Sequence, residues 1–240
     1  MCTLEKRGNL FLLTLTGDDE HRLSPTLIET IRTTLRQIRT DAKPGSALVT
    51  TAEGKFFSNG FDLAYAQAAG SAGFYGRLHE MVENFKPIVA DLLSLPLPTI
   101  AAVSGHAAAA GFLLALSHDY VLMRKDRGVL YMSEIDIGLT FPDYFMALMK
   151  SKISSPIARR DVVLQASKIK AEKAVEMGII DSAYNSLEET MEAALRLGEK
   201  LAARKWKGEI YADIRKNAFP EISELLGLVE NFKSVVPARL

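Results

Sequence analysis

Short apolar runs typical of buried strands alternate along this chain with segments of helical periodicity. The runs SALVTTA (46–52) and PTIAAVSG (98–105) are rich in β-branched and small apolar residues. Ser24 and Pro25 precede apolar residues at helical spacing, which predicts a helix ending near Asp41. Such alternation favours an α/β fold with a largely parallel sheet. Beyond Pro142 the pattern is mostly helical, so we also expect a helical C-terminal region.

The charge balance and the residue types present exclude several classes of function. Among 240 residues, Lys plus Arg and Asp plus Glu both number 29, which gives no electrostatic basis for binding nucleic acid or an anionic membrane. The single cysteine and the four histidines lack metal-ligand spacing, so no metal site is expected. The N-terminus has no apolar signal core, and the apolar stretch 99–116 is too short to span a bilayer. Small-molecule chemistry in a reducing compartment is the expectation.

Two loops of small and polar residues follow the apolar runs. They are GKFFSNGFDL (54–63) and SGHAAAAG (104–111), and both lead toward helical patterns. The start of a helix carries unpaired N–H groups and a positive dipole end, which attract an oxygen that gains negative charge. Small side chains would let a ligand oxygen reach such N–H groups. Tight helix packing is the alternative explanation of the alanines, because Ala is also the best helix former.

The ordered pair of loops resembles the two signatures of the enoyl-CoA hydratase/isomerase (crotonase) superfamily. GKFFSNGFDL is similar to the first signature, and PTIAAVSGHAAAAGFLLALSHDYVLM (98–123) is similar to the second. Within the superfamily the chain resembles the plant peroxisomal Δ3,Δ2-enoyl-CoA isomerases. The ending Ala238-Arg239-Leu240 is similar to the Ser-Lys-Leu peroxisomal address.

This resemblance implies a crotonase-like ββα spiral core over residues 1–200. A helical extension over 201–240 would follow and end in the targeting tripeptide. The family's oxyanion hole, two backbone N–H groups that hold a thioester oxygen, would be formed by Phe61 and Ala110. The coenzyme A part of the substrate would contact the first loop, at Ser58, Asn59, Gly60, Phe61, Asp62 and Leu63. The resemblance further implies a homotrimer or hexamer, with no cofactor besides the coenzyme A of the substrate.

The catalytic acid is less uniquely indicated. Family hydratases carry a glutamate two residues after the small triplet, and that position is Leu113 here, which cannot accept a proton. Glu134 matches the spacing of hydratases and mitochondrial isomerases relative to Gly138. The spacing of fungal and animal peroxisomal isomerases points to Pro142, beside Asp143. Glu134 is favoured narrowly, and Asp143 is equally suited to cap a helix. Strand alternation would place Asp136 on the same face as Glu134.

The resulting expectation is a Δ3,Δ2-enoyl-CoA isomerase of peroxisomal β-oxidation. It would convert 3-enoyl-CoA to 2-trans-enoyl-CoA with one carboxylate base, and a peroxisomal import receptor would recognise its C-terminus. Two alternatives stay open. One is another crotonase reaction, such as 2-enoyl-CoA hydration or acyl-CoA thioester hydrolysis, and the other is a non-catalytic acyl-CoA-binding subunit.

Overall fold

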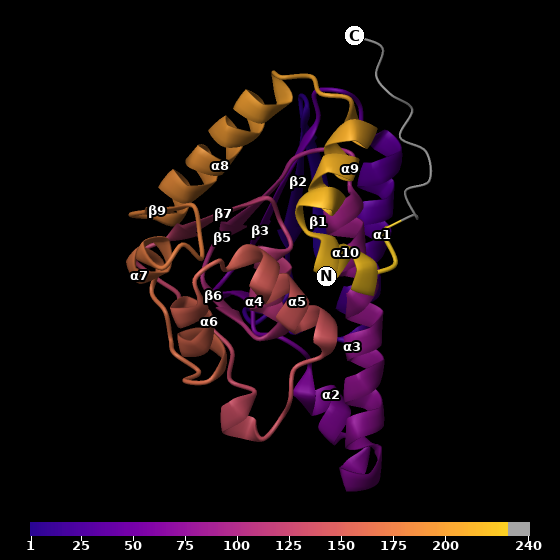
Figure 1. The fold of residues 1–240 in the computed structure, drawn as a ribbon, viewed down its shortest axis with the longest axis vertical. Coiled ribbons are helices and arrows are strands. Elements are labelled where there is room, and N and C mark those ends of the chain that lie inside the picture. The colour runs from indigo at the N-terminus through magenta and orange to yellow at the C-terminus, as the bar shows by residue number, and fades with distance from the viewer. Residues whose placement is uncertain (230–240) are drawn as a thin grey trace.

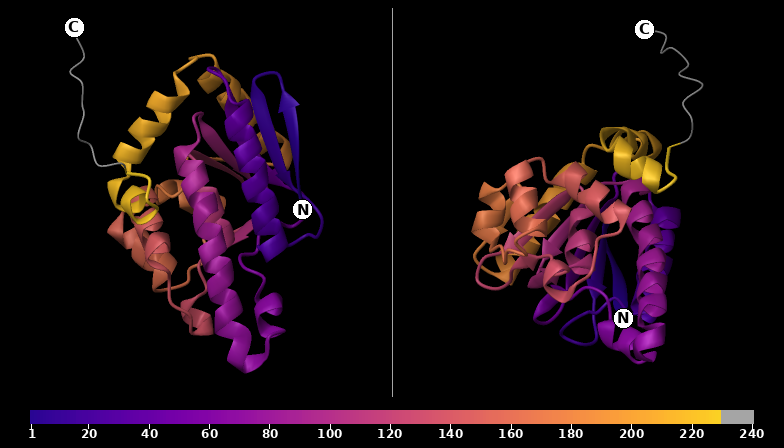
Figure 2. Two further views of the ribbon diagram at one scale, coloured as in Figure 1. Left: turned by 90° about the vertical axis from the view of Figure 1, so that its right-hand side faces the viewer. Right: turned by 60° about the horizontal axis from the view of Figure 1, so that its bottom comes forward.

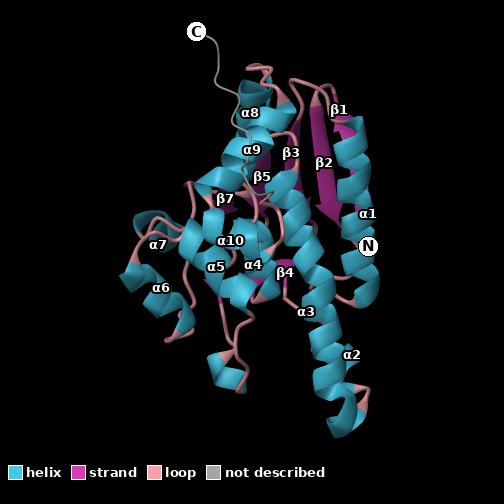
Figure 3. Ribbon diagram, turned by 45° about the vertical axis from the view of Figure 1, so that its right-hand side comes forward, coloured by secondary structure: helices cyan, strands magenta, loops and turns pink. Residues whose placement is uncertain are grey.

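Six strands form the larger sheet of the computed structural model, which describes residues 1–229. In spatial order they are β1 (Cys2–Arg7), β2 (Leu10–Leu15), β3 (Ala47–Ala52), β5 (Thr99–Val103), β7 (Tyr120–Arg124) and β9 (Ser182–Tyr184). β1 and β2 form an antiparallel hairpin, and every later pairing in this sheet is parallel. Figure 3 shows β1, β2, β3, β5 and β7 lying side by side. The predicted α/β class and largely parallel sheet are confirmed.

Helices cover both faces of this sheet. α1 (Pro25–Asp41) and α3 (Gly70–Ser94) pack against one face, and α8 (Leu187–Ala202) packs against the other (Figure 1). Neighbouring residues of one strand pack on different faces of the sheet, because successive side chains of a strand point to opposite sides. Leu13 therefore belongs to the core under α1 and α3, whereas Leu12 belongs to the core under α8.

Two long helices, α1 and α3, pack against one face of the larger sheet, and the local sequence explains where α1 begins. The Ser24 hydroxyl accepts a hydrogen bond from the Leu27 N–H at 3.3 Å, and Pro25 occupies the first turn of α1, as its fixed φ allows. In α3 the buried residues begin at Met81, so only the C-terminal half packs on the sheet. The N-terminal half of α3, together with α2 (Leu63–Gln67), projects beyond the sheet (Figure 2, left view). This projecting part forms one wall of the cavity described below.

A second, smaller sheet carries the loops that the sequence singled out. It contains β4 (Phe56–Ser58), β6 (His106–Ala108) and β8 (Leu130–Tyr131), all parallel. β4 and β6 lie within the segments predicted as loops, because runs of three residues carry no periodicity. The carboxyl ends of the three strands meet at one edge, where ligands bind in parallel sheets.

The chain after Pro142 is mainly helical, as predicted. Helix α4 (Ala110–Leu116) and the 3₁₀ helix η1 (Ile135–Ile137) lie before Pro142 in the chain. The later helices are α5 (Asp143–Lys152), α6 (Pro156–Val163), α7 (Ala171–Glu176), α9 (Gly208–Ala218) and α10 (Pro220–Leu225). The expected boundary between residues 200 and 201 falls in the last turn of α8 and stays a prediction. The tripeptide Ala238-Arg239-Leu240 lies outside the described residues.

Arg215 ties the C-terminal helices to the centre of the molecule. Its guanidinium makes two 2.6 Å hydrogen bonds to the carboxylate of Asp119, and only 5% of the residue is exposed. The same guanidinium donates to the carbonyl oxygens of Leu95 and Leu97, which follow α3. α9 is therefore fixed to the end of α3 by a paired, buried charge.

Candidate active site

Each strand of the small sheet leads directly to a residue that the sequence analysis placed in the site. Phe61 follows β4, Ala110 follows β6, and Glu134 follows β8. The register pairs Phe56 with His106 and Ala107 with Leu130, so the three strands end at the same level. The fold therefore brings residues that are far apart in sequence to one edge of this sheet.

Gly60 shows how closely the two signature loops approach each other. Its φ is +74°, a conformation that favours glycine. A methyl group added at Gly60 would lie 3.0 Å from the Ala109 Cβ, 3.1 Å from the Ala108 carbonyl oxygen and 3.6 Å from the Ala110 backbone nitrogen. Phe61, the next residue, is therefore held beside the first turn of α4.

Ala109 turns the chain from β6 into α4. Its φ of +49° and ψ of −125° lie in a region that residues with a side chain rarely adopt. The Ala109 N–H donates to the Tyr131 carbonyl at 2.9 Å, which links this turn to β8. Gly111 packs so tightly that an added methyl group would lie 2.3 Å from the Ser58 carbonyl oxygen. Close packing of the two loops thus accounts for at least part of the small-residue pattern.

The backbone amides of Phe61 and Ala110 have no acceptor in the described part of the chain. Phe61 bridges Leu23 in parallel fashion, with its neighbours Gly60 and Asp62 making the hydrogen bonds to Leu23. Within residues 1–229, neither the Phe61 N–H nor the Ala110 N–H donates a hydrogen bond to a protein acceptor. Two neighbouring unpaired amides are the arrangement that an oxyanion hole requires. Their role as the hole stays a prediction.

A cavity of about 860 Å³ opens at this edge of the sheet. One wall comes from α3, and the opposite wall comes from η1 and the start of α5. Its apolar surface includes the side chains of Leu78, Val82, Phe141, Tyr144 and Phe145. Phe61, Ala108 and Ala109 also line it, whereas Ala110 is fully buried behind them. The cavity has the size and apolar character of a small-molecule site.

Glu134 is the most perturbed carboxylate of the cavity. Only 8% of the residue is exposed, and its Oε2 atom is buried without a hydrogen-bond partner in the described structure. Burial raises the pKa of Glu134 from 4.5 to about 7, partly offset by a hydrogen bond from its own backbone amide. A carboxylate with a pKa near neutrality is well matched to accepting and returning a proton.

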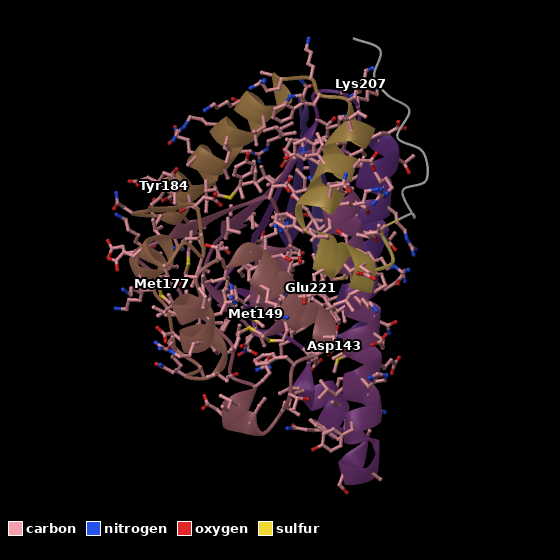
Figure 4. All side chains as sticks on the ribbon, in the orientation of Figure 1. Asp143, Met149, Met177, Tyr184, Lys207 and Glu221 are labelled. Atoms are coloured by element: carbon pink, nitrogen blue, oxygen red, sulfur yellow. The ribbon has the colours of Figure 1, made fainter. Side chains whose placement is uncertain are left out.

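Asp143 also lines the cavity but lies in a different environment. It is the first residue of α5 (Figure 4). It is exposed, and within residues 1–229 it makes no capping hydrogen bond. Pro142 occupies the N-cap position, so the prediction that Asp143 caps this helix is wrong. Asp136 belongs to η1 and not to a strand, so the expected sharing of a strand face with Glu134 is also wrong. The bend at η1 leaves Asp136 exposed and outside the cavity wall.

The remaining first-loop residues divide into two groups. Asn59, Phe61 and Leu63 line the cavity, and their predicted contacts to coenzyme A stay predictions. Ser58 is buried, and Asp62 caps α2 by accepting a hydrogen bond from the Tyr65 N–H at 3.1 Å. Their predicted substrate contacts, and that of Gly60, remain predictions.

Several cavity residues were missed by the sequence analysis. Tyr131 lies at the carboxyl end of β8 and donates a hydrogen bond to the Asn59 Oδ1 at 3.5 Å. Its position at the end of an apolar run was the available signal. His79 and Lys86 contribute polar groups from α3, where their spacing of seven residues places them on one helix face. Leu113, by contrast, is fully buried in α4 and does not line the cavity.

Among residues 1–229, no helix has both the length and the apolar character to cross a membrane. In the same range, no group of three or more His, Cys, Asp or Glu side chains is arranged to hold a metal ion.

The chain is similar to known proteins in both sequence and fold. Residues 5–220 match the family model described as enoyl-CoA hydratase/isomerase. The chain is 64% identical to "Enoyl-CoA delta isomerase 2, peroxisomal" of Arabidopsis thaliana, covering 95% of this chain and 96% of the relative. It is 53% identical to "Enoyl-CoA delta isomerase 1, peroxisomal" of the same plant, covering 98% and 97%. An enoyl-CoA hydratase from Mycobacterium marinum has a similar fold, with a TM-score of 0.82 over 94% of both chains at 22% identity. The chain thus belongs to the enoyl-CoA hydratase/isomerase family and has the crotonase fold that its two signature loops predicted.

Proposed function

We propose that this protein is a Δ3,Δ2-enoyl-CoA isomerase that converts 3-enoyl-CoA to 2-trans-enoyl-CoA. The observation that carries the proposal is Glu134, a buried carboxylate without a hydrogen-bond partner in the wall of a cavity floored by two loops with unpaired amides. The names of the Arabidopsis relatives support the same activity.

The reaction needs one base and a place for negative charge. Glu134 removes a proton from C2 of the acyl chain, and the electron pair of that C–H bond moves into a dienolate whose charge rests on the thioester oxygen. The N–H groups of Phe61 and Ala110 donate to this oxygen. The protonated Glu134 then returns the proton to C4, and the double bond forms between C2 and C3. The sum of the steps moves one proton and consumes nothing.

The environment of Glu134 suits both halves of this cycle. With a pKa of about 7, the carboxylate is substantially ionised at neutral pH and regains its proton without a large penalty. The apolar side chains of α3 and α5 keep water away from the dienolate, which strengthens the hydrogen bonds that hold its charge.

The interior position of Leu113 argues against ordinary hydration. Addition of water across a double bond needs a group that activates the water in addition to the acid that protonates carbon. Family hydratases place a glutamate where this chain has a leucine, and the leucine is fully buried away from the cavity. A site with one buried carboxylate is sufficient for isomerisation.

The decisive assay follows the absorbance of the conjugated thioester as 3-enoyl-CoA is converted, with 2-enoyl-CoA hydration measured in parallel. Glu134→Gln should reduce kcat about 1,000-fold, because the amide cannot accept the proton. Asp143→Asn is the matched control and should retain most of the activity, since this carboxylate is exposed.

Other results of these assays would indicate a different catalytic base or a different function. If Asp143→Asn is inactive and Glu134→Gln is active, Asp143 is the base. If wild-type protein hydrates 2-enoyl-CoA or hydrolyses the thioester without isomerising 3-enoyl-CoA, the protein performs another crotonase reaction. If it binds acyl-CoA and converts none of these substrates, it is a binding subunit.

We also propose that the protein acts in peroxisomal β-oxidation of unsaturated fatty acids. Two relatives are named peroxisomal, and the terminal Ala238-Arg239-Leu240 is similar to a peroxisomal address that an import receptor reads. Deleting these three residues from a fluorescent fusion should leave it outside peroxisomes. Light scattering of the purified protein tests the proposed homotrimer or hexamer. Activity of the protein after exhaustive dialysis against a chelator tests the proposal that the reaction uses no cofactor beyond the substrate's coenzyme A.

A further inference from the structure

The segment 18–23, between β2 and α1, lies along the first signature loop and is hydrogen-bonded to it throughout. The Phe56 N–H donates to the Asp19 carbonyl at 3.0 Å, and the Asn59 N–H donates to the Glu20 carbonyl at 2.8 Å. The Leu23 N–H donates to the Gly60 carbonyl, also at 2.8 Å. The chain on both sides of Phe61 is thus held by a segment distant in sequence.

His21 occupies the centre of this segment in an unusual state. Its φ is +45°, a left-handed conformation that is uncommon for residues other than glycine, and 2% of the residue is exposed. The Asp18 carboxylate holds the turn by accepting hydrogen bonds from the backbone N–H groups of Glu20 and His21, at 2.9 Å and 2.6 Å. This arrangement directs the imidazole into the protein and against β4.

Both the ring and the backbone of His21 contact β4. The ring Nδ1 lies 3.0 Å from the Phe56 carbonyl oxygen, and because a carbonyl only accepts, Nδ1 carries the proton. The Ser58 hydroxyl donates to the His21 carbonyl oxygen at 2.8 Å. His21 therefore contacts the first and last residues of β4, immediately before the chain turns at Gly60.

The other ring nitrogen of His21 shows that the residue is not optimal for stability alone. Nε2 is buried and has no hydrogen-bond partner in the described structure, which costs free energy. A left-handed φ adds a second cost. A glycine at this position would remove both costs and would also remove the contact with Phe56.

We propose that His21 is a positioning residue of the oxyanion hole. Through the Phe56 carbonyl and the Ser58 hydroxyl it fixes the direction in which β4 enters the Gly60 turn, so that the Phe61 N–H points at the thioester oxygen. This inference rests on the proposed function. It assigns to His21 an effect on the polarisation of the bound thioester, beyond an effect on folding.

His21→Ala and His21→Asn test the proposal as a pair. Alanine removes the ring donor and disfavours the left-handed turn, whereas asparagine tolerates that turn and places an amide nitrogen near the position of Nδ1. Ser58→Ala removes the second contact while leaving residue 21 unchanged, and it decides the question if His21→Ala does not fold. Thr50→Val is the matched control, because it removes the 2.8 Å hydrogen bond to another buried imidazole, His118, away from the cavity.

The measurements are kcat and KM for 3-enoyl-CoA, the unfolding temperature, and the spectrum of a bound probe. The probe is a 2-enoyl-CoA with a 4-dimethylaminophenyl group on C3, whose absorption moves to longer wavelength when its carbonyl is polarised. His21→Ala and Ser58→Ala should lower kcat about 10-fold to 100-fold with KM changed less than about 3-fold, and should reduce the red shift. His21→Asn should recover most of both, and Thr50→Val should lower only the unfolding temperature.

The inference is overturned if wild-type protein isomerises the substrate and shifts the probe while His21→Ala or Ser58→Ala behaves like Thr50→Val. A wild-type protein that neither isomerises 3-enoyl-CoA nor shifts the probe overturns the proposed function itself. Failure of the inference is therefore seen in the variants, whereas failure of the proposed function is seen in the wild-type protein.

Discussion

Replacing Glu134 by glutamine should stabilise the folded protein in a manner that depends on pH. Burial raises the pKa of this carboxyl from 4.5 to about 7, so the folded state holds the proton more tightly than the unfolded state. Between pH 4.5 and about pH 7 the folded protein binds more protons than the unfolded chain, so the free energy of unfolding falls as the pH rises. Glutamine has nearly the same shape and does not ionise, so the Glu134→Gln variant does not lose stability in this way as the pH rises.

The size of the effect follows from the same shift. The full shift corresponds to about 3 kcal/mol, since each pKa unit is worth about 1.4 kcal/mol. Between about pH 5 and about pH 8.5, the stability advantage of Glu134→Gln over wild type should grow by about 2.5 kcal/mol. Most of this growth should occur below about pH 7.

Urea unfolding at fixed protein concentration measures this difference. Fluorescence of the single tryptophan, Trp206, and far-UV circular dichroism provide two independent signals. Asp143→Asn serves as the comparison, because an exposed carboxylate has no desolvation cost to lose. A stability advantage of Glu134→Gln that stays constant over the whole pH range would refute the reasoning, since it would show that Glu134 is not desolvated in the folded state.

Three further substitutions test other parts of the structure. Gly60→Ala should lower kcat more than about 10-fold in the isomerase assay, because the new methyl group displaces the turn at Ala109 and the residue must keep a positive φ. Leu113→Glu should cost about 3 kcal/mol or more in urea unfolding without creating hydratase activity, because the new carboxylate is buried outside the cavity. Arg215→Met should lower the free energy of unfolding by about 3–5 kcal/mol, since it leaves Asp119 buried and unpaired; an unchanged unfolding midpoint would contradict this.

The elements that the sequence predicted well are those with long or distinctive local patterns. The helix from Pro25 to Asp41 has a hydroxyl cap, a proline in its first turn and apolar residues at regular spacing, and the structure matches the predicted limits. The runs that became β3 and β5 were equally recognisable. In each case the information lies within one segment of the chain.

The candidate site was only partly predictable, because its geometry depends on contacts between segments. Sequence similarity indicated Phe61 and Ala110, but the contact of their loops at Gly60 becomes visible only in three dimensions. Spacing alone did not separate Glu134 from Asp143, and only the structure shows that Glu134 is buried whereas Asp143 is exposed. His21 has no motif that distinguishes it from a surface residue, since its left-handed turn is set by Asp18 and by packing on β4.

The small sheet has a consequence for how such chains are aligned. β4, β6 and β8 each lead one segment to the same edge of the small sheet. The loop after β8 can gain or lose a residue while the strand pairing beneath the two amide-bearing turns stays intact. Equivalent acids in different members should therefore be found by counting from the last paired residue of the third strand, here Tyr131, instead of from a glycine farther along the loop.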